Sequence, residues 1–242
     1  MTRIPSSDAG TRPSRQPGHR CLPMNIATLP GNSLFYTNLY VLFIPGETAC
    51  LVVDPGELQP GTAQFLEQNG LTPAAYLLTH PHIDHVAGLH EFQERWPAPV
   101  WLHPEGLPLY RGVGQQAAMF GLDNPILPEI DQWFAPPQHL EFGPLAVDIR
   151  HTPGHSPGCV SILFQEEDSE PDVPSVIVGD VLFAGSIGRT DLPGGSMSTL
   201  LRSIESELLC LPDTTKVYSG HGTPTTIGRE RRSNPFLQEL SS

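Results

Sequence analysis

The sequence offers little that would take the protein into a membrane or onto nucleic acid. The longest apolar run near its start, Leu39 to Ile44, ends at Pro45, whereas a helix that spans a bilayer needs about 20 apolar residues. Basic residues are scarce, because 13 Lys and Arg stand against 26 Asp and Glu and the net charge is −13. Such a chain repels the phosphate backbone of nucleic acids. We therefore expect neither a membrane span nor a nucleic-acid partner.

Cysteine is also scarce, and its spacing excludes two common kinds of site. The chain has four widely separated cysteines: Cys21, Cys50, Cys159 and Cys210. No two of them have the close spacing of a zinc knuckle or a redox motif. We expect reduced thiols and a cytoplasmic protein. The alternative is an organellar transit peptide at the Arg-containing start of the chain, which its prolines and its lack of an apolar segment disfavour.

Length and composition limit the domain organisation. A chain of 242 residues can form one large domain or two small ones, and its 23 Gly and 27 Pro imply many turns between short elements. Residues 1–23 contain four Arg and few apolar residues, so we predict a disordered extension there. Residues 24–242, beginning at Met24, are predicted to form a single folded domain.

The remaining pattern predicts alternating strands and helices. It indicates a hairpin of 38–44 with 49–54, helices over 63–69, 86–96 and 198–209, and strands at 75–79, 100–103, 140–149, 159–164, 176–178 and 217–219. The segment 104–137, rich in Gly and Pro, is expected to be an insertion of loops and helices near the site. Two β-rich halves with helices outside predict an α/β protein with the four layers of an αββα sandwich, in which strand ends deliver loop residues to one edge.

Four potential metal ligands lie within six residues directly after a predicted strand. They are His80, His82, Asp84 and His85, and imidazole nitrogen with carboxylate oxygen suits a divalent ion such as zinc. In an extended loop His80 and His82 point the same way, because side chains alternate with a period of two. The alternative is a surface histidine cluster in which Asp84 merely caps the helix that begins near His85.

Three later motifs strengthen the metal interpretation. The turn 151–158 presents His155 from a backbone that Pro and Gly restrict, Asp180 ends an apolar strand, and His221 follows another strand between two glycines. A carboxylate at the end of a buried strand is costly unless it binds a cation. Each motif alone is typical of ordinary loop residues, but together, in this order, they indicate a metal centre.

Other polar residues are interpreted as structural. Three histidines belong to no motif and are assigned to the surface or the core: His90, His103 and His139. His151 is expected to form a hydrogen bond to a metal ligand, and Asp54 to brace the ligand loop from a turn. Arg229 and Arg232 are expected on a solvated helix face, with a contact to a substrate carboxylate as the alternative.

The ordered set of the motif HxHxDH at 80–85 with His155, Asp180 and His221 resembles the metallo-β-lactamase fold superfamily over residues 24–242. Within it, the segments 182–195 and 220–235 look like the short bacterial glyoxalase-II-like hydrolases, which are thioesterases acting on hydroxyacylglutathione. The resemblance implies the four-layer sandwich of that superfamily with the metal site at one edge. It also implies two divalent ions, with zinc expected and iron or manganese as alternatives.

The resemblance assigns a role to each site residue. One metal would be held by His80, His82 and His155 and the other by Asp84, His85 and His221, with Asp180 bridging them. Asp84 and Asp180 are the expected catalytic residues, because they position the metal-bound hydroxide. Two cations that share a water lower its pKa, so no serine or cysteine nucleophile is needed. Arg189 is expected to bind the substrate.

Two features depart from full-length glyoxalase II. The chain stops about twenty residues after His221, so we expect the C-terminal helical domain that helps the longer enzymes to bind glutathione to be absent. Arg189 is kept nine positions after Asp180, but Asp191 replaces the aromatic residue expected two positions further on. The expected partner is therefore a small-molecule thioester, of which a glutathione conjugate is one case.

Two other functions stay open. One is a persulfide dioxygenase, which the segment 188–191 also resembles and which would hold a single iron with two histidines and one aspartate. The other is a non-catalytic metal-binding or regulatory protein that kept the fold. The complete second ligand set, including His221, favours the dinuclear hydrolase. The oligomeric state does not follow from the sequence.

Overall fold

The computed structural model describes residues 22–238 of the chain, so nearly all of the extension predicted at 1–23 lies outside the described residues. Its centre is two sheets of six strands each. The first contains, in spatial order, β1 (Asn25–Asn32), β2 (Thr37–Phe43), β3 (Ala49–Val53), β4 (Thr72–Leu77), β5 (Val100–Leu102) and β6 (Gln132–Trp133). The second contains β14 (Thr225–Thr226), β13 (Lys216–Ser219), β10 (Ser175–Gly179), β9 (Val160–Phe164), β8 (Leu145–His151) and β7 (Gln138–Phe142). A separate hairpin joins β11 (Leu182–Phe183) to β12 (Ser186–Ile187).

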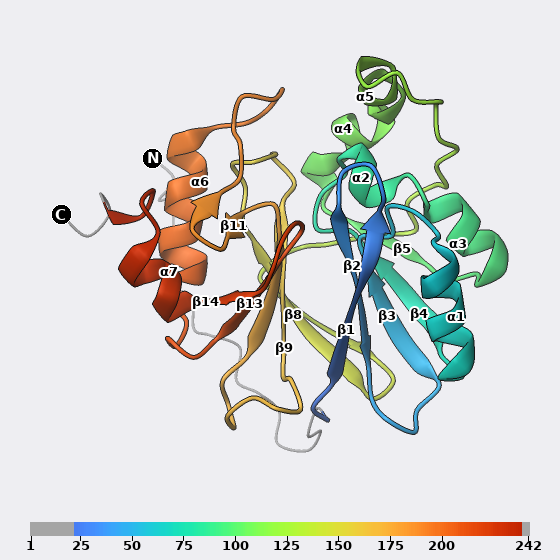
Figure 1. Ribbon diagram of the computed structural model, residues 1–242, viewed down its shortest axis with the longest axis horizontal. Helices are drawn as coiled ribbons and strands as arrows, with labels where there is room; N and C mark the ends of the chain where they lie inside the picture. The colour runs from blue at the N-terminus through green and yellow to red at the C-terminus, as the bar shows by residue number, and fades with distance from the viewer. Residues whose placement is uncertain (1–21, 239–242) are drawn as a thin grey trace, which may run out of the picture.

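Helices lie outside both sheets (Figure 1). On the side of the first sheet are α1 (Pro60–Gln68), α2 (Ile83–Val86), α3 (Leu89–Arg95), η1 (Pro104–Gly106), α4 (Leu107–Arg111) and α5 (Val113–Met119). On the side of the second are α6 (Met197–Ser203), the π-helical turn η2 (Ile204–Leu208) and α7 (Ile227–Ser233). None of these helices is long and apolar enough to cross a bilayer. The layers confirm the predicted αββα sandwich.

Three clusters of buried apolar side chains separate the layers of the described chain. In β2, Tyr40 and Leu42 belong to the cluster between the sheets, whereas Leu39 and Val41 belong to the cluster that includes α1 and α3. A strand buried on both faces has a continuous apolar sequence, which explains the run found there. The third cluster joins the second sheet to α6, η2 and α7.

Most predicted elements are present, and three differences have physical causes. The sequence pattern does not predict β1, an edge strand whose Pro30 and Gly31 weaken the strand signal and accompany a shift in pairing register. The segment 140–149 forms two strands instead of one, because Gly143 turns the chain at a φ of 63°. The predicted insertion at 104–137 contains helices and irregular loops, but it ends in β6, which extends the first sheet.

The buried ring of Phe134 provides a test of the core between the sheets. Phe134 is 1% exposed and stacks on Trp101 with ring centroids 5.7 Å apart. Phe134→Ala should lower the free energy of unfolding by about 3–5 kcal/mol, because it removes buried apolar surface and leaves a cavity. Phe236 is 46% exposed, so Phe236→Ala should change it by no more than about 0.5 kcal/mol. Urea denaturation measures both, and equal losses would contradict the placement of Phe134.

Candidate metal centre

The segment 80–85 places four polar side chains beyond the carboxyl end of β4. The chain passes through His80 and His82 into the short helix α2, which contains Asp84 and His85 in its single turn. All four residues are buried, with 0 to 9% exposed. Asp84 does not cap the helix, because its Oδ2 accepts a hydrogen bond from Thr37 Oγ1 at 2.7 Å. The segment is therefore neither a surface cluster nor a simple cap.

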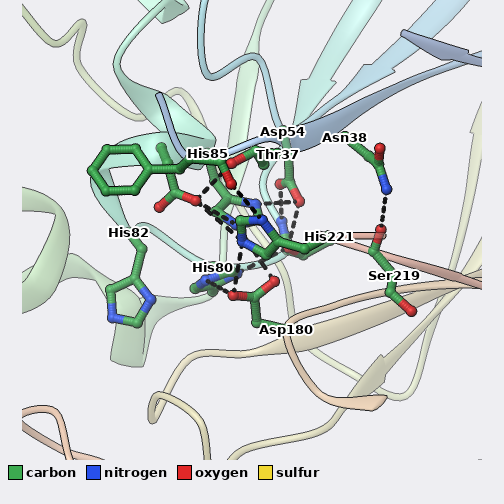
Figure 2. A network of polar contacts seen from close by, with 12 residues as sticks. Thr37, Asn38, Asp54, His80, His82, His85, Asp180, Ser219 and His221 are labelled. Atoms are coloured by element: carbon green, nitrogen blue, oxygen red, sulfur yellow. Dashed lines mark hydrogen bonds and ion pairs between the residues drawn. The ribbon is translucent and has the colours of Figure 1, made fainter. Parts of the chain in front are cut away.

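Three loops of the second sheet bring the remaining residues to this segment. His155 lies in the turn after β8, while Asp180 and His221 follow the parallel strands β10 and β13. His155 Nε2 is 2.8 Å from His82 Nδ1, and His221 Nε2 is 3.3 Å from Asp84 Oδ2. Figure 2 shows Asp180 and His221 beside His80 and His85. The structure thus brings together all seven residues that the sequence singles out.

The seven side chains form two groups of three with Asp180 between them. Within each group one ligand atom per residue lies within 4.8 Å of the others: the first triplet is His80, His82 and His155, and the second triplet is Asp84, His85 and His221. The Asp180 carboxylate contacts both, since its Oδ2 is 3.7 Å from His155 Nε2 and 3.4 Å from His221 Nε2. Its Oδ1 is 3.5 Å from His85 Nε2. This geometry allows two cations to share one carboxylate.

Three buried atoms of the site have no hydrogen-bond partner. They are His80 Nε2, His85 Nε2 and Asp180 Oδ1. Buried polar atoms are nearly always paired, and an unpaired one costs roughly 1–3 kcal/mol. A divalent cation accepts electron pairs from imidazole nitrogen and carboxylate oxygen alike, so it satisfies all three atoms. The residues present therefore fit a divalent metal.

Main-chain carbonyl groups orient two of the imidazoles. His155 Nδ1 lies 2.8 Å from the carbonyl oxygen of Arg189, and His221 Nδ1 lies 3.1 Å from that of Phe35. A carbonyl oxygen only accepts hydrogen bonds, so each Nδ1 is the donor. In the neutral ring, Nε2 then presents its lone pair to the centre of the site.

Through its carboxylate, Asp54 orients a third imidazole, that of His85. Its carboxylate lies 3.0 Å from His85 Nδ1 and accepts hydrogen bonds from the Thr79 amide at 2.8 Å and the Thr79 hydroxyl at 2.6 Å. Its φ of 54° is rare for a residue with a side chain. Although Asp54, His80 and His85 also lie within 4.8 Å of one another, the contacts to Thr79 and His85 engage both oxygens. The expectation that Asp54 braces the ligand loop is confirmed.

The first triplet favours neutral imidazoles. Burial, reinforced by the neighbouring His85 and other histidines of the site, holds the pKa of His80 well below its ordinary value. Burial beside His155 lowers the pKa of His82 to about 3. Burial also lowers the pKa of His155, although Asp180 opposes it. These rings are therefore in the form that ligates a metal.

The two imidazoles of the second triplet, those of His85 and His221, have raised pKa values. Burial acts to lower the pKa of His85, but Asp84, Asp180 and Asp54 outweigh it and raise that pKa to about 9. Burial is likewise outweighed at His221, where hydrogen bonds to Asp180 and Asp84 raise the pKa to about 10. The metal-free site therefore holds protons where a metal would bind.

The glycine before His221 allows the close approach of the two halves. A Cβ on Gly220 would lie 2.1 Å from Asp180 Oδ1 and 2.7 Å from His85 Cε1. Any side chain would therefore displace the loop or the metal-binding residues. The Gly220 amide also donates to the carbonyl oxygen of Gly179 at 2.8 Å, which ties the loop to β10.

Residues of β2 support the site in a way that the sequence does not reveal. Besides Thr37, the Asn38 amide donates to the carbonyl oxygen of Gly220 at 2.7 Å, and the Asn38 side chain donates to that of Ser219 at 3.0 Å. The Tyr40 hydroxyl donates to the same Ser219 oxygen at 2.6 Å. The only sequence signal is that polar residues open an apolar strand.

The remaining histidines lie outside the centre. The prediction that His151 forms a hydrogen bond to a metal-binding residue is wrong. The turn folds back, so the Nε2 atom of His151 instead lies 2.8 Å from the carbonyl oxygen of Pro157. The His151 ring stacks on the buried His103, with centroids 4.1 Å apart. His90 and His139 contact carboxylates on the surface, as interpreted from the sequence.

Two of the three arginines that the sequence singles out have carboxylate partners within the chain. The Arg189 side chain is 60% exposed, and its Nε and Nη2 each donate to the Asp191 carboxylate at 2.7 Å. Arg232 pairs with Asp213 at 3.2 Å, whereas Arg229 is exposed. The solvated helix face expected for Arg229 and Arg232 is thus what the structure shows.

Comparisons with known proteins place the chain in a family. The model of the Metallo-beta-lactamase superfamily matches residues 32–221. The probable metallo-hydrolase YqgX of Bacillus subtilis is 41% identical over 206 residues, which are 82% of this chain and 92% of that protein. The hydroxyacylglutathione hydrolase GloC of Haemophilus influenzae is 36% identical over 222 residues, 90% of this chain and 100% of that protein.

A solved structure shows the same architecture. The structure of TTHA1623 in a di-iron-bound form matches with a TM-score of 0.72 and 39% identity, covering 83% of this chain and 95% of that one. In this chain the two triplets meet where loops of the two sheets converge. The chain is therefore a metallo-hydrolase of the metallo-beta-lactamase superfamily.

Proposed function

We propose that the seven residues hold two divalent cations and that the protein hydrolyses small-molecule thioesters of the S-hydroxyacylglutathione type. The observation that carries the proposal is the position of Asp180 between two triplets, each of which contains one buried imidazole nitrogen without a partner. Zinc is the expected metal, with iron or manganese as alternatives. The di-iron form of TTHA1623 supports two ions, and the name of GloC supports the substrate class.

The chain supplies the geometry for hydrolysis. When bound, two divalent cations lower the pKa of a shared water and stabilise negative charge on a carbonyl oxygen. Asp84, held by the Thr37 hydroxyl, and Asp180, between the triplets, are positioned to orient the attacking water. The side chain of His221 is 31% exposed, whereas the other six residues are buried. The substrate carbonyl therefore approaches beside His221.

The chemistry of the nearby thiol supports attack by water. Burial raises the pKa of Cys159 to about 12, so it is not a thiolate at neutral pH. Its sulfur lies 3.2 Å from Ser156 Oγ, and both residues are fully buried. Neither side chain is presented to a substrate, which favours water over a covalent nucleophile.

Arg189 is the proposed substrate-binding residue, and its partner limits that role. It lies directly after the hairpin that follows Asp180, and its carbonyl oxygen holds His155. Its guanidinium, however, is paired with Asp191. A substrate carboxylate must compete with Asp191 for this charge, so we expect weaker binding of anionic thioesters than a free arginine would give.

Metal content and thioester hydrolysis test the proposal directly. The wild-type protein should bind two zinc ions per chain and hydrolyse S-lactoylglutathione. His85→Ala should lose the ion of the second triplet and slow hydrolysis about 100-fold or more, because charge stabilisation at the carbonyl oxygen is lost. Mass spectrometry of bound metal and loss of thioester absorbance measure both. The matched control is His90→Ala, which removes a half-buried histidine outside the site.

Other outcomes support the other functions. A single bound iron with oxygen consumption on glutathione persulfide would contradict the hydrolase and support the dioxygenase. Bound metal with neither reaction would support a non-catalytic metal-binding protein. Unchanged metal content and rate in His85→Ala would contradict the assignment of the second triplet.

The protonation of the triplets predicts how zinc affinity depends on pH. The pKa values of about 9 and 10 at His85 and His221 mean that protons compete with the metal at neutral pH. The affinity of the second triplet should therefore rise between pH 6.5 and 8.5, by up to about tenfold per pH unit for each proton displaced. The affinity of the first triplet should rise little, because the pKa of His82 is about 3. Competition with a chromophoric chelator at several pH values measures both, and two equal slopes would contradict the assignment.

The Arg189–Asp191 pair predicts a change in substrate affinity. Asp191→Asn should lower KM for S-lactoylglutathione about 2- to 5-fold with kcat unchanged, because it frees the guanidinium for glutathione carboxylates. The matched control is a neutral thioester, S-acetyl-N-acetylcysteamine, whose KM should stay the same. If KM for the anionic thioester is unchanged too, Arg189 does not contact bound substrate.

A further inference from the structure

A fully buried carboxylate lies among the loops of the second sheet and takes no part in the chemistry described above. Glu230 of α7 is 0% exposed. Its Oε2 accepts hydrogen bonds from the Gly185 amide at 2.8 Å and from Asn234 Nδ2 at 2.9 Å. Its Oε1 accepts from the Thr225 hydroxyl at 2.5 Å. All three donors are uncharged, so this carboxylate joins segments by hydrogen bonds and not by an ion pair with them.

The first segment that Glu230 holds is the hairpin between two parts of the metal centre. Gly185 is at the turn of the β11–β12 hairpin, which starts just after Asp180 and ends just before Arg189. The carbonyl oxygen of Arg189 orients His155. Asn234 holds the hairpin as well, because its Nδ2 donates a hydrogen bond to the carbonyl oxygen of Ser186 at 3.0 Å. Displacement of this hairpin would therefore move Asp180 and His155.

The second segment is the loop that carries His221. Thr225 stands in β14, directly after that loop, and pairs with Val217 of β13, the strand that leads into it. The loop is thus held by β13 on one side and by Glu230 on the other. One side chain of α7 consequently connects both loops that leave the parallel strands β10 and β13.

We infer that Glu230 and Asn234 form a clamp that sets the spacing of the three metal-binding residues of the second sheet, and that metal affinity depends on it. The inference rests on the proposed metal centre and assigns Glu230 as a positioning residue for it. The segment 80–85 is held separately, by Asp54 and Thr37. The clamp therefore controls the fit of the second sheet's residues to those of the first.

The role is geometric, which makes a conservative variant informative. In Glu230→Gln the amide oxygen can face the Gly185 and Asn234 donors. Its NH₂ group can donate to the Thr225 hydroxyl, which accepts as well as donates. All three hydrogen bonds therefore survive without the negative charge. Glu230→Ala removes all three, and Thr225→Val removes only the bond to the loop of His221.

The same sheet offers a matched control at its opposite end. Glu166 is 7% exposed and accepts a hydrogen bond from the Ser175 hydroxyl at 2.5 Å, as well as bonds from Tyr218 and Lys216. Ser175 begins β10, whereas Asp180 follows its other end. Ser175→Ala therefore deletes a hydroxyl-to-carboxylate bond of the same length and burial that does not hold a metal-binding loop.

Zinc affinity measured by chelator competition tests the clamp, with the thermal midpoint of each metal-free protein recorded in parallel. Thr225→Val and Glu230→Ala should raise the Kd of the more weakly held zinc about 10- to 100-fold, as loss of outer-sphere support does. Glu230→Gln should stay within about 3-fold of wild type, because its hydrogen bonds persist. Ser175→Ala should lower the midpoint as Thr225→Val does and leave Kd within about 2-fold. If Glu230→Ala does not fold, Thr225→Val still provides the test.

Three results would overturn the clamp. They are a wild-type Kd in Thr225→Val, an equal rise of Kd in Ser175→Ala, and a loss of affinity in Glu230→Gln as large as in Glu230→Ala. The first excludes positioning, the second shows a general effect of stability, and the third shows that charge matters instead of geometry. Failure of the wild-type protein to bind zinc would instead overturn the metal centre itself, which separates the two failures.

Discussion

The structure depends on compensating three carboxylates that are buried among five imidazoles at one edge of the sandwich. Asp54, Asp84 and Asp180 are at most 9% exposed, and an ionised carboxylate taken out of water without partners costs several kcal/mol. Asp54 has three donors and Asp84 has the Thr37 hydroxyl. Asp180 is left with an unpaired oxygen, and it is the carboxylate between the triplets. The unmet demand for positive charge is thus at the centre of the site.

The two sheets contribute residues to this centre in different ways. The first contributes a contiguous segment, 80–85, whose geometry follows from one strand end and one short helix. The second contributes single residues from separate loops, so each needs its own long-range support. His221 is oriented by the carbonyl oxygen of Phe35 from the opposite half, and its loop is tied to Asn38. The precision of the site therefore depends on packing between the halves as much as on the metal-binding residues.

The local part of this site is predictable from the sequence, whereas most of its long-range part is not. The segment 80–85 and the strands that end at Asp180 and His221 have short-range signatures of spacing and apolar runs. Their division into two triplets came from the family resemblance, because spacing alone does not show which loops meet. Glu230 could not be identified, since it lies between Arg229 and Arg231 in a charged run that resembles a solvated helix face, yet it is fully buried. The support from β2 could not be predicted either, because a polar pair at the start of an apolar strand has no periodic pattern.

The carboxylates that shape the metal centre also determine which of its histidines are protonated. His85 and His155 are both buried, and each has an oxygen beside Nδ1. Burial lowers both pKa values, but three carboxylates surround His85 and raise its pKa to about 9, whereas His155 has only Asp180 close enough to oppose burial strongly. The protonated His85 and His221 therefore offset only part of the negative charge of the three carboxylates in the metal-free site. Because metal binding must displace these protons, the arrangement of carboxylates that creates the second triplet also makes its affinity depend on pH.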